Sequence, residues 1–256
     1  MEKKEYPILE FDPAERAVLN PDRISKRLEI PETCVICFFQ DVLAKVIQTE
    51  DVKRVGRQKS EMGWHPIYQL QREGKSIVFF NPGVGAPLAA AMLEEIISRG
   101  CTKFIVCGGA GVLDATIEMG RFLILEQAVR DEGTSYHYLP PARETTADPM
   151  IVSALETTLQ QNNMVGQRVK TWTTDAIYRE TPARVSRRRA EGCLTVEMEA
   201  AALFAVAHFR GVKLGQIVYA GDALDGAKWQ SRGWSSATSI RQQLFWLSAA
   251  CALALS

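Results

Sequence analysis

Histidine is scarce in this chain: its 256 residues include only His65, His137 and His208, which lie far apart. Zinc is usually held by clusters of histidine and cysteine, so this scatter predicts no metal site. Long apolar runs are missing as well. The longest, residues 244–255, spans about a dozen residues, whereas a membrane helix needs roughly twenty. It predicts a terminal helix packed on the core or on a partner subunit.

No charge of one sign dominates, because 30 lysines and arginines balance 30 aspartates and glutamates. This balance argues against a nucleic-acid partner or an anionic membrane surface and favours a small-molecule ligand. The first residues, MEKKEYPILEFDPAER, lack the apolar core of a secretory signal, so we expect a cytoplasmic protein.

The six cysteines, without an export signal, predict buried thiols and no disulfide framework. Cys34 and Cys37 form a CxxC pattern, but it lies in the β-branched and aromatic run TCVICFF. Alternation along a strand sends these two side chains to opposite faces. A redox or metal role for the pair is therefore disfavoured.

Short apolar runs alternate with longer stretches of helical period, which is typical of an α/β fold. We predict a single three-layer α/β/α domain over residues 1–256 with a central mixed β-sheet, closed by a C-terminal helix at 236–256. The expected strands are 33–39, 67–71, 76–80, 103–107, 121–126, 168–173 and 213–220. The expected helices are 41–49, 87–99, 149–161, 182–191, 197–210 and 236–253.

Two glycine-rich segments follow predicted strands: NPGVGAP at 81–87, and GGAG at 108–111, which we interpret as a second turn. A glycine turn between a strand and a helix points backbone N–H groups at the carboxyl edge of the sheet, where anions bind. Glycine can equally serve only to turn the chain, and both interpretations stay open. Neither segment fits the dinucleotide fingerprint GxGxxG or a Walker loop, which disfavours a Rossmann dehydrogenase and a P-loop enzyme.

Carboxylates stand at two predicted strand ends. Glu197 and Glu199 precede the helical run AAALFAVAHF, where they either cap the helix or bind a ligand, since an apolar helix begins near the interior. Asp222 ends the apolar strand KLGQIVYAGD, where partial desolvation would suit it to proton donation; alternatively it caps the next segment. We expect Asp225 to be solvated.

A third strand end, TWTTDAIYRE, combines hydroxyl, charged and apolar side chains that could hold a flat heterocycle. The residues proposed to do so are Thr174, Asp175, Ile177 and Tyr178. The basic cluster at 184–189 follows a helical pattern, and we expect a solvated helix face there.

The segment VEMEAAALFAVA, residues 196–207, resembles the helix signature of the family of uridine phosphorylases, hexameric-type purine nucleoside phosphorylases and methylthioadenosine/S-adenosylhomocysteine nucleosidases. GVGAP, FIVCGGAG, TTDAIYRE and the strand ending at Asp222 follow in the same order. The resemblance covers roughly residues 75–225, whereas residues 1–60 diverge. It implies a phosphorylase/hydrolase-like fold and cleavage of a bond between a sugar and a base.

The resemblance implies a role for each matched residue. Met198 and Glu199 would hold the ribose hydroxyls, and Glu197 would lie beside the base or brace the site. Asp222 would protonate the leaving base, as in the purine-directed members. The arginine and glutamine that bind uracil have no counterpart after Tyr178, which also favours a purine-like base.

The phosphate site departs from the family. The GDPxR turn of the phosphorylases corresponds to CFFQDVLAK here, and the arginine and hydroxyl residue around the second glycine segment correspond to Val106 and Gly109. The remaining candidates for binding phosphate are backbone amides, with help from an arginine. The amides are those of Gly83, Gly85, Gly108 and Gly109, and the arginines are Arg54, Arg57 and Arg179.

The sequence thus predicts a nucleoside phosphorylase that yields free base and sugar 1-phosphate. Phosphate would be a co-substrate, and no cofactor is expected. Two alternatives stay open: a nucleosidase that uses water, and a catalytically weak protein that binds a nucleoside. The resemblance also implies a homo-oligomer, either a dimer or a hexamer.

Overall fold

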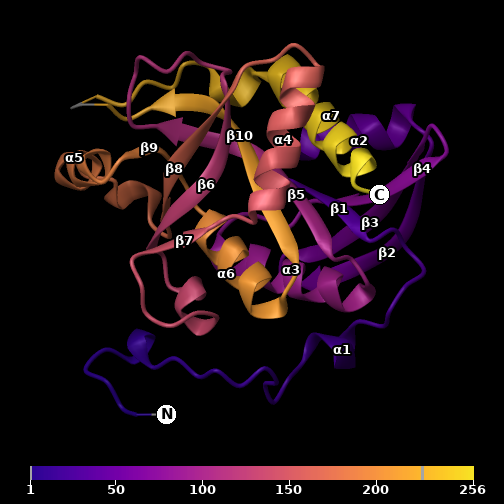
Figure 1. The fold of residues 1–256 in the computed structure, drawn as a ribbon, viewed down its shortest axis with the longest axis horizontal. Coiled ribbons are helices and arrows are strands. Elements are labelled where there is room, and N and C mark those ends of the chain that lie inside the picture. Colours follow the sequence, from indigo (N-terminus) through magenta and orange to yellow (C-terminus); the bar gives the residue numbers. More distant parts are fainter. Residues whose placement is uncertain (1, 226–227) are drawn as a thin grey trace.

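The computed structural model describes residues 2–225 and 228–256, and the ten strands of these residues share one mixed sheet (Figure 1). The strands are β1 (Thr33–Cys37), β2 (Val52–Ser60), β3 (Gly63–Arg72), β4 (Lys75–Phe80), β5 (Lys103–Val112), β6 (Phe122–Asp131), β7 (Glu144–Thr146), β8 (Gly166–Thr174), β9 (Cys193–Glu197) and β10 (Lys213–Ala223). The α-helices are α1 (Pro21–Ile24), α2 (Gln40–Thr49), α3 (Ala86–Arg99), α4 (Pro149–Gln161), α5 (Pro182–Ala190), α6 (Ala200–Arg210) and α7 (Thr238–Ala254). The 3-10 helices are η1 (Pro7–Leu9), η2 (Thr134–His137), η3 (Ile177–Arg179) and η4 (Trp234–Ser236).

Part of the sheet closes on itself. β5 pairs with β10, β10 with β6, β6 with β8, β8 with β9, and β9 again with β5. The pairs β10–β6 and β9–β5 are antiparallel, and the other three are parallel. From this ring the sheet continues through β1 and β4 to the antiparallel hairpin of β3 and β2. The predicted mixed central sheet is confirmed.

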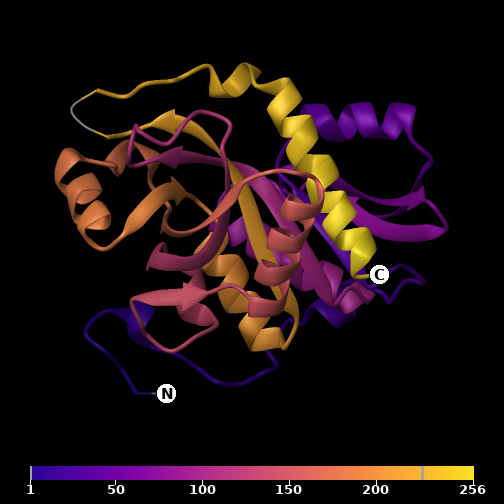
Figure 2. The ribbon, with the colours of Figure 1, turned by 45° about the horizontal axis from the view of Figure 1, so that its top comes forward.

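Helices cover both faces of the sheet. Helices α3 and α6 pack against each other, and α6 also contacts β6, β8 and β10. On the opposite face α4 packs on β6 and β10, while α7 packs on β1, β4 and β5 (Figures 1 and 2). This arrangement confirms the three-layer α/β/α fold. Most of the apolar run at 244–255 belongs to α7 and is buried, and no described helix is long and apolar enough to cross a membrane.

The second glycine segment is not a turn, contrary to the sequence prediction. Strand β5 continues to Val112, and Gly108 and Gly109 lie beside Val218 and Tyr219 of β10. A Cβ atom at Gly109 would stand 3.0 Å from the Tyr219 ring, so glycine here permits a close approach between strands. The first segment is a true turn, because Gly83 and Gly85 have φ angles of 79° and 95°.

Helix α6 begins at Ala200, three residues later than predicted. Glu197 is the last residue of β9, and its carboxylate accepts hydrogen bonds from the first N–H groups of the helix. Helix α6 ends at Arg210, and its C-cap residue Gly211 has a left-handed φ of 66°. Its side chains from Ala200 to Ala207 are buried, as expected of a helix that is apolar all round.

The basic cluster at 184–189 is a mostly solvated helix face, as predicted, because Arg184, Arg187 and Arg189 are exposed; Arg188 is the exception. Arg188 is 7% exposed, with its guanidinium 3.0 Å from Asp131 and 2.8 Å from Glu191. Asp225 is partly exposed, and its Oδ2 accepts the N–H of Ala115 at 3.0 Å. The predicted buried thiols are confirmed, because all six cysteines are free and buried.

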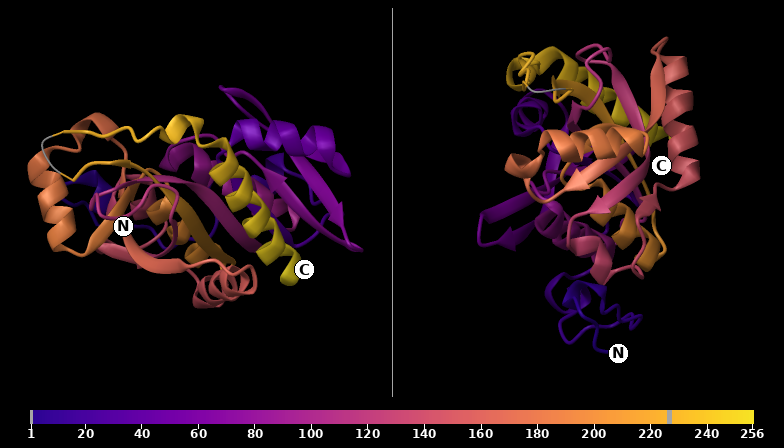
Figure 3. Two further views of the ribbon diagram at one scale, coloured as in Figure 1. Left: turned by 90° about the horizontal axis from the view of Figure 1, so that it is seen from above. Right: turned by 90° about the vertical axis from the view of Figure 1, so that its left-hand side faces the viewer.

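The N-terminal residues lie outside the layered core. They run along the lower edge of the molecule in Figure 1 and extend below its body in the right-hand view of Figure 3. Two hydrogen bonds attach this segment: the Leu28 N–H donates to the Arg99 carbonyl, and the Arg210 guanidinium donates to the Glu15 carbonyl.

Candidate active site

The predicted carboxylates gather where several strands end. In the parallel pair β8–β9, Thr173 lies beside Glu197, so the ends of both strands meet. The end of β5 pairs with β9 at Gly111 and Val196. A Cβ atom at Gly111 would lie 3.1 Å from Val196 Cγ1 and 3.3 Å from Asp222 Oδ1. Asp222 therefore stands one strand away from the segment that carries Glu197 and Glu199.

Glu197 is held by the chain itself. It is 7% exposed, and its Oε2 accepts the N–H groups of Glu199 at 2.7 Å and Ala200 at 2.6 Å. Its Oε1 accepts the Thr173 hydroxyl at 2.6 Å. Burial raises the pKa of Glu197 to about 7, although these hydrogen bonds favour its charged form. Glu197 thus caps α6 and braces β8 against β9.

Glu199 is the N-cap residue of α6 and is 6% exposed. Its Oε1 accepts the N–H of Gly85 at 2.6 Å, a contact between residues 114 positions apart. Burial, followed by the charge of Glu197, raises the pKa of Glu199 to about 8. No described side chain donates a hydrogen bond to Glu199, so the carboxylate keeps acceptor capacity for hydroxyl groups. Met198 lies between the two glutamates and is half-buried.

The turn at 81–87 uses its amides internally. The side chain of Asn81 accepts the N–H of Gly83 at 2.9 Å and donates to the Cys37 carbonyl at 3.0 Å. The N–H of Gly85 is bonded to Glu199. Both amides that the sequence offered to phosphate in this turn are therefore occupied. Asn81 was not predicted as part of the site, although asparagine before a glycine is a common turn signal.

The other phosphate candidates lie apart from this turn. Gly108 and Gly109 belong to strand β5, where they pair in parallel register with β10. The Arg57 guanidinium stacks on the Trp64 ring at 3.7 Å, on the hairpin of β2 and β3. In residues 2–225 and 228–256 no arginine or lysine side chain hydrogen-bonds to the turn at 81–87.

Asp222, at the end of β10, forms a second acidic centre with Glu180. The indole Nε1–H of Trp229 donates to Asp222 Oδ2 at 2.6 Å. Glu180 follows η3, and burial together with the charge of Asp222 raises its pKa to about 7. Neither Glu180 nor Trp229 was predicted from the sequence as part of the site.

The residues predicted to hold the base are differently exposed. Thr174 is buried, whereas Ile177 and Tyr178 are 54% and 95% exposed. Asp175 is exposed and accepts the N–H of Gly133 at 2.9 Å. Thr174 and Asp175 therefore hold the loop in place, and Ile177 and Tyr178 present an apolar surface to solvent.

Glu132, which the sequence analysis did not single out, is a further carboxylate close to this region. It follows β6, is 6% exposed, and accepts the N–H of Ser135 at 2.9 Å. Its Oε1 is buried without a hydrogen-bond partner among the described residues. Burial raises the pKa of Glu132, with a smaller contribution from the charge of Asp175.

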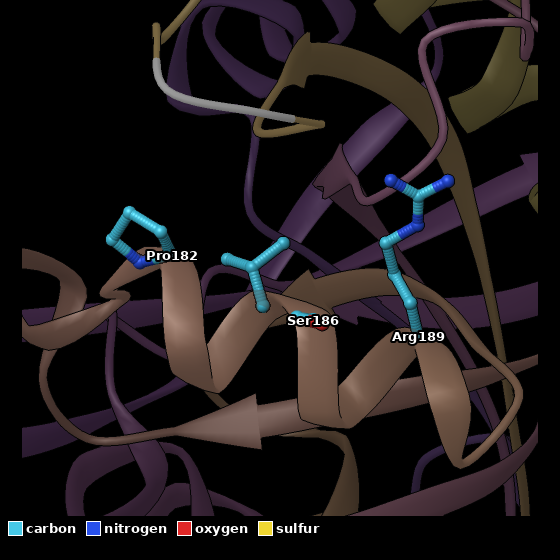
Figure 4. A pocket seen from close by; sticks show the side chains of 4 residues that line it. Pro182, Ser186 and Arg189 are labelled. Carbon is cyan, nitrogen blue, oxygen red and sulfur yellow. The ribbon is translucent and has the colours of Figure 1, made fainter.

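Two surface cavities lie apart from the predicted carboxylates. The larger, of about 180 Å³, is lined by Pro182, Val185, Ser186 and Arg189 along α5 (Figure 4). A smaller one lies between α6 and the start of α4. No group of three potential metal ligands occurs in the described part of the chain. Hydrogen bonds and strand register, and not a hollow, define the candidate site.

Comparison with known proteins gives a consistent result. The chain is 31% identical over 157 residues to the guanosine phosphorylase of Halorubrum lacusprofundi, a match covering 60% of this chain and 64% of that protein. It is 29% identical over 206 residues to the uridine phosphorylase of Thermococcus kodakarensis, covering 71% and 73%. The chain thus spans slightly less than two thirds of the first relative and somewhat more of the second.

The fold recurs in the purine nucleoside phosphorylase of Toxoplasma gondii, solved with immucillin-H. That structure superimposes with a TM-score of 0.77 and 17% identity, over 89% of this chain and 92% of its own. Residues 32–242 also match the family model described as the phosphorylase superfamily. With the conserved architecture, this match over most of the chain shows that the protein belongs to the phosphorylase superfamily.

Proposed function

We propose that this protein cleaves the N-glycosidic bond of a nucleoside, with phosphate as the acceptor, to give free base and sugar 1-phosphate. The observation that carries the proposal is the buried carboxylate of Glu199, held by the Gly85 N–H and by no described side chain. A carboxyl group fixed in this way offers its oxygens to the ribose hydroxyls, and hydrogen bonds from those hydroxyls favour its charged form against the effect of burial. Met198 would lie against the sugar beside it.

The second acidic centre supplies the other requirement of the reaction. Cleavage places positive charge on the sugar and negative charge on the departing base. A proton donor beside the base and a carboxylate near the ribose both stabilise that transition state. We propose that Asp222 and Glu180 lie beside the departing base, since the charge of Asp222 acts on Glu180 and Glu180 closely follows the exposed Ile177 and Tyr178 in the chain.

We propose a purine-like base. An acid at the end of β10 suits protonation of a purine ring nitrogen, and Glu180, Thr181 and Pro182 stand where uridine phosphorylases carry uracil-binding residues. The guanosine phosphorylase relative supports a purine, whereas the uridine phosphorylase relative shows that pyrimidine enzymes lie at a similar distance.

Hydrolysis is a second candidate, and one observation favours it. The N–H groups of Gly83 and Gly85 are already bonded to Asn81 and Glu199, so a phosphate ion would have to displace protein acceptors. Water needs no such anion site. The two phosphorylase relatives support phosphate as the acceptor of the sugar. The occupied N–H groups of the turn at 81–87 support water as the acceptor.

Product analysis separates these reactions. Purified protein is incubated with purine and pyrimidine nucleosides, with and without phosphate, and free base, free sugar and sugar 1-phosphate are measured by mass spectrometry. We expect sugar 1-phosphate from a purine nucleoside only when phosphate is present. Base release that ignores phosphate would instead establish a nucleosidase. Binding without any product would establish a catalytically weak nucleoside-binding protein.

We further propose that the protein acts as a homo-oligomer, a dimer or a hexamer. Ile177 and Tyr178 are exposed in the single chain, and a neighbouring subunit would cover them when the base is bound. Native mass spectrometry would show the subunit number, and a protein that stays monomeric at micromolar concentration would contradict this proposal.

A further inference from the structure

Glu180 has the features of a proton donor that the sequence assigned to Asp222. It lies at the C-terminal end of η3 and is half-buried, and its carboxyl group makes no hydrogen bond or ion pair with the described residues. Burial and the nearby charge of Asp222 raise the pKa of Glu180 to about 7. Glu180 therefore holds a proton in a substantial part of the molecules at neutral pH.

Asp222 has the features of the charged partner. The Trp229 Nε1–H donates to Asp222 Oδ2 at 2.6 Å. An indole can only donate a hydrogen bond, and a carboxylate accepts such a bond more strongly than a neutral carboxyl group does. Asp222 therefore has a donor suited to a charged carboxylate, whereas the Glu180 carboxyl group beside that charge has none.

The other charged groups around this pair are engaged elsewhere or exposed. Arg179, next to Glu180 in η3, is exposed. Arg184 in α5 lies 3.6 Å from Asp131, and Asp225 beyond β10 accepts the N–H of Ala115. Asp222 is the group whose charge acts on Glu180.

We propose that Glu180, and not Asp222, gives its proton to the departing base, while Asp222 is a positioning residue that keeps Glu180 protonated. This inference rests on the proposed function and names its acid. As the C1′–N bond breaks, its electron pair goes to the base nitrogen, which takes the Glu180 proton. Glu180 becomes a carboxylate and regains a proton from solvent, which receives the one released by the incoming phosphate or water.

The experiment compares Glu180→Gln and Asp222→Asn with two kinds of substrate. One is the nucleoside that the wild-type protein cleaves, and the other is 4-nitrophenyl riboside, whose leaving group departs without a proton. We expect Glu180→Gln to lower kcat about 100-fold on the nucleoside and less than about 5-fold on the nitrophenyl riboside. Glu61→Gln, an exposed carboxylate at the β2–β3 turn, is the matched control.

The pH dependence of kcat separates the donor from its partner. In the wild type kcat falls as the pH rises through about 7, because Glu180 loses its proton there. Asp222→Asn removes the neighbouring charge, so this fall moves to lower pH but persists. In Glu180→Gln the fall is absent. Glu180→Asp, which keeps an acid, recovers part of the activity, and unfolding curves of all variants exclude a folding defect.

Three results would overturn the inference. If the fall in kcat with pH survives in Glu180→Gln and vanishes in Asp222→Asn, Asp222 is the donor. That result would leave the proposed function standing. Equal losses on both substrates would show that Glu180 does not protonate the base. Absence of base release by the wild-type protein would remove the proposed function and this inference together.

Discussion

The protein carries two pairs of carboxylates in very different surroundings. The inner pair, Glu197 and Glu199, is buried and bonded to backbone N–H groups of α6 and of the turn at 81–87. The outer pair, Glu180 and Asp222, is half-buried and is contacted by one indole N–H. Fixed backbone donors hold a carboxylate in place, whereas two acids with few partners can share and pass on a proton. The inner pair is suited to positioning and the outer pair to acid catalysis.

The two members of the inner pair also differ. Glu197 accepts two N–H groups and a threonine hydroxyl, which use both of its oxygens. Glu199 accepts one N–H, that of Gly85 in the turn after β4. We infer that Glu197 is mainly structural and that Glu199 is the member left for a ligand.

The largest expected effect is a loss of stability in Glu197→Ala. The N–H groups of Glu199 and Ala200 and the Thr173 hydroxyl would lose their acceptor in a buried place. We expect the free energy of unfolding to fall by about 3 kcal/mol, measured by urea denaturation. Glu197→Gln, which keeps one acceptor oxygen, should lose about half as much. A stable Glu197→Ala protein would refute the bracing role.

Glu199→Ala should show the opposite pattern. We expect kcat/KM for the nucleoside to fall about 100-fold, because the variant loses the acceptor for the sugar hydroxyls. Its stability should be unchanged or higher, since a buried carboxyl group disappears and Gly85 is half-buried, so that its N–H can bind water. Steady-state kinetics and thermal melts together test this. Wild-type kinetics in the variant would exclude Glu199 from the sugar site.

The strands that are buried on both faces of the sheet could be predicted from the sequence. TCVIC, SIVFF and KFIVC are almost wholly buried, and such continuous apolar runs are typical of central strands. Strand β2, with the sequence VKRVGRQKS, was missed because it lies at the edge of the sheet and is mostly polar. Pairing with β3, and not its own pattern, makes it a strand.

The contacts of the site were beyond the reach of local patterns. The bond between Gly85 and Glu199 joins residues 114 positions apart, and only the fold brings them together. The two glycine segments look alike in the sequence, yet Gly85 has a positive φ and Gly109 lies in a strand beside Tyr219. The carboxylates could be found from their places at strand ends, but which acid holds a proton depends on Trp229 and on burial.

The inner pair should make the protein less stable as the pH rises. Burial raises the pKa of Glu197 to about 7 and of Glu199 to about 8, above the value of about 4.3 for an unfolded glutamate. Between these values the folded chain holds protons that the unfolded chain has released, so the free energy of unfolding falls with increasing pH. We expect the Tm to drop by about 5 °C between pH 5.5 and 8.5. Glu199→Gln should reduce that drop, and an equal drop in the variant would locate its origin elsewhere.

The smallest expected effect concerns the single donor to the outer pair. Trp229→Phe keeps an aromatic ring but removes the N–H that holds the charge on Asp222. Without that donor the outer pair binds its proton more tightly, so the fall in kcat with pH should move to higher pH. At pH 7 kcat should change by no more than about 3-fold, because the Glu180 carboxyl remains. A kcat profile that moves to lower pH, or a loss as large as that of Glu180→Gln, would show that the indole itself contacts the substrate.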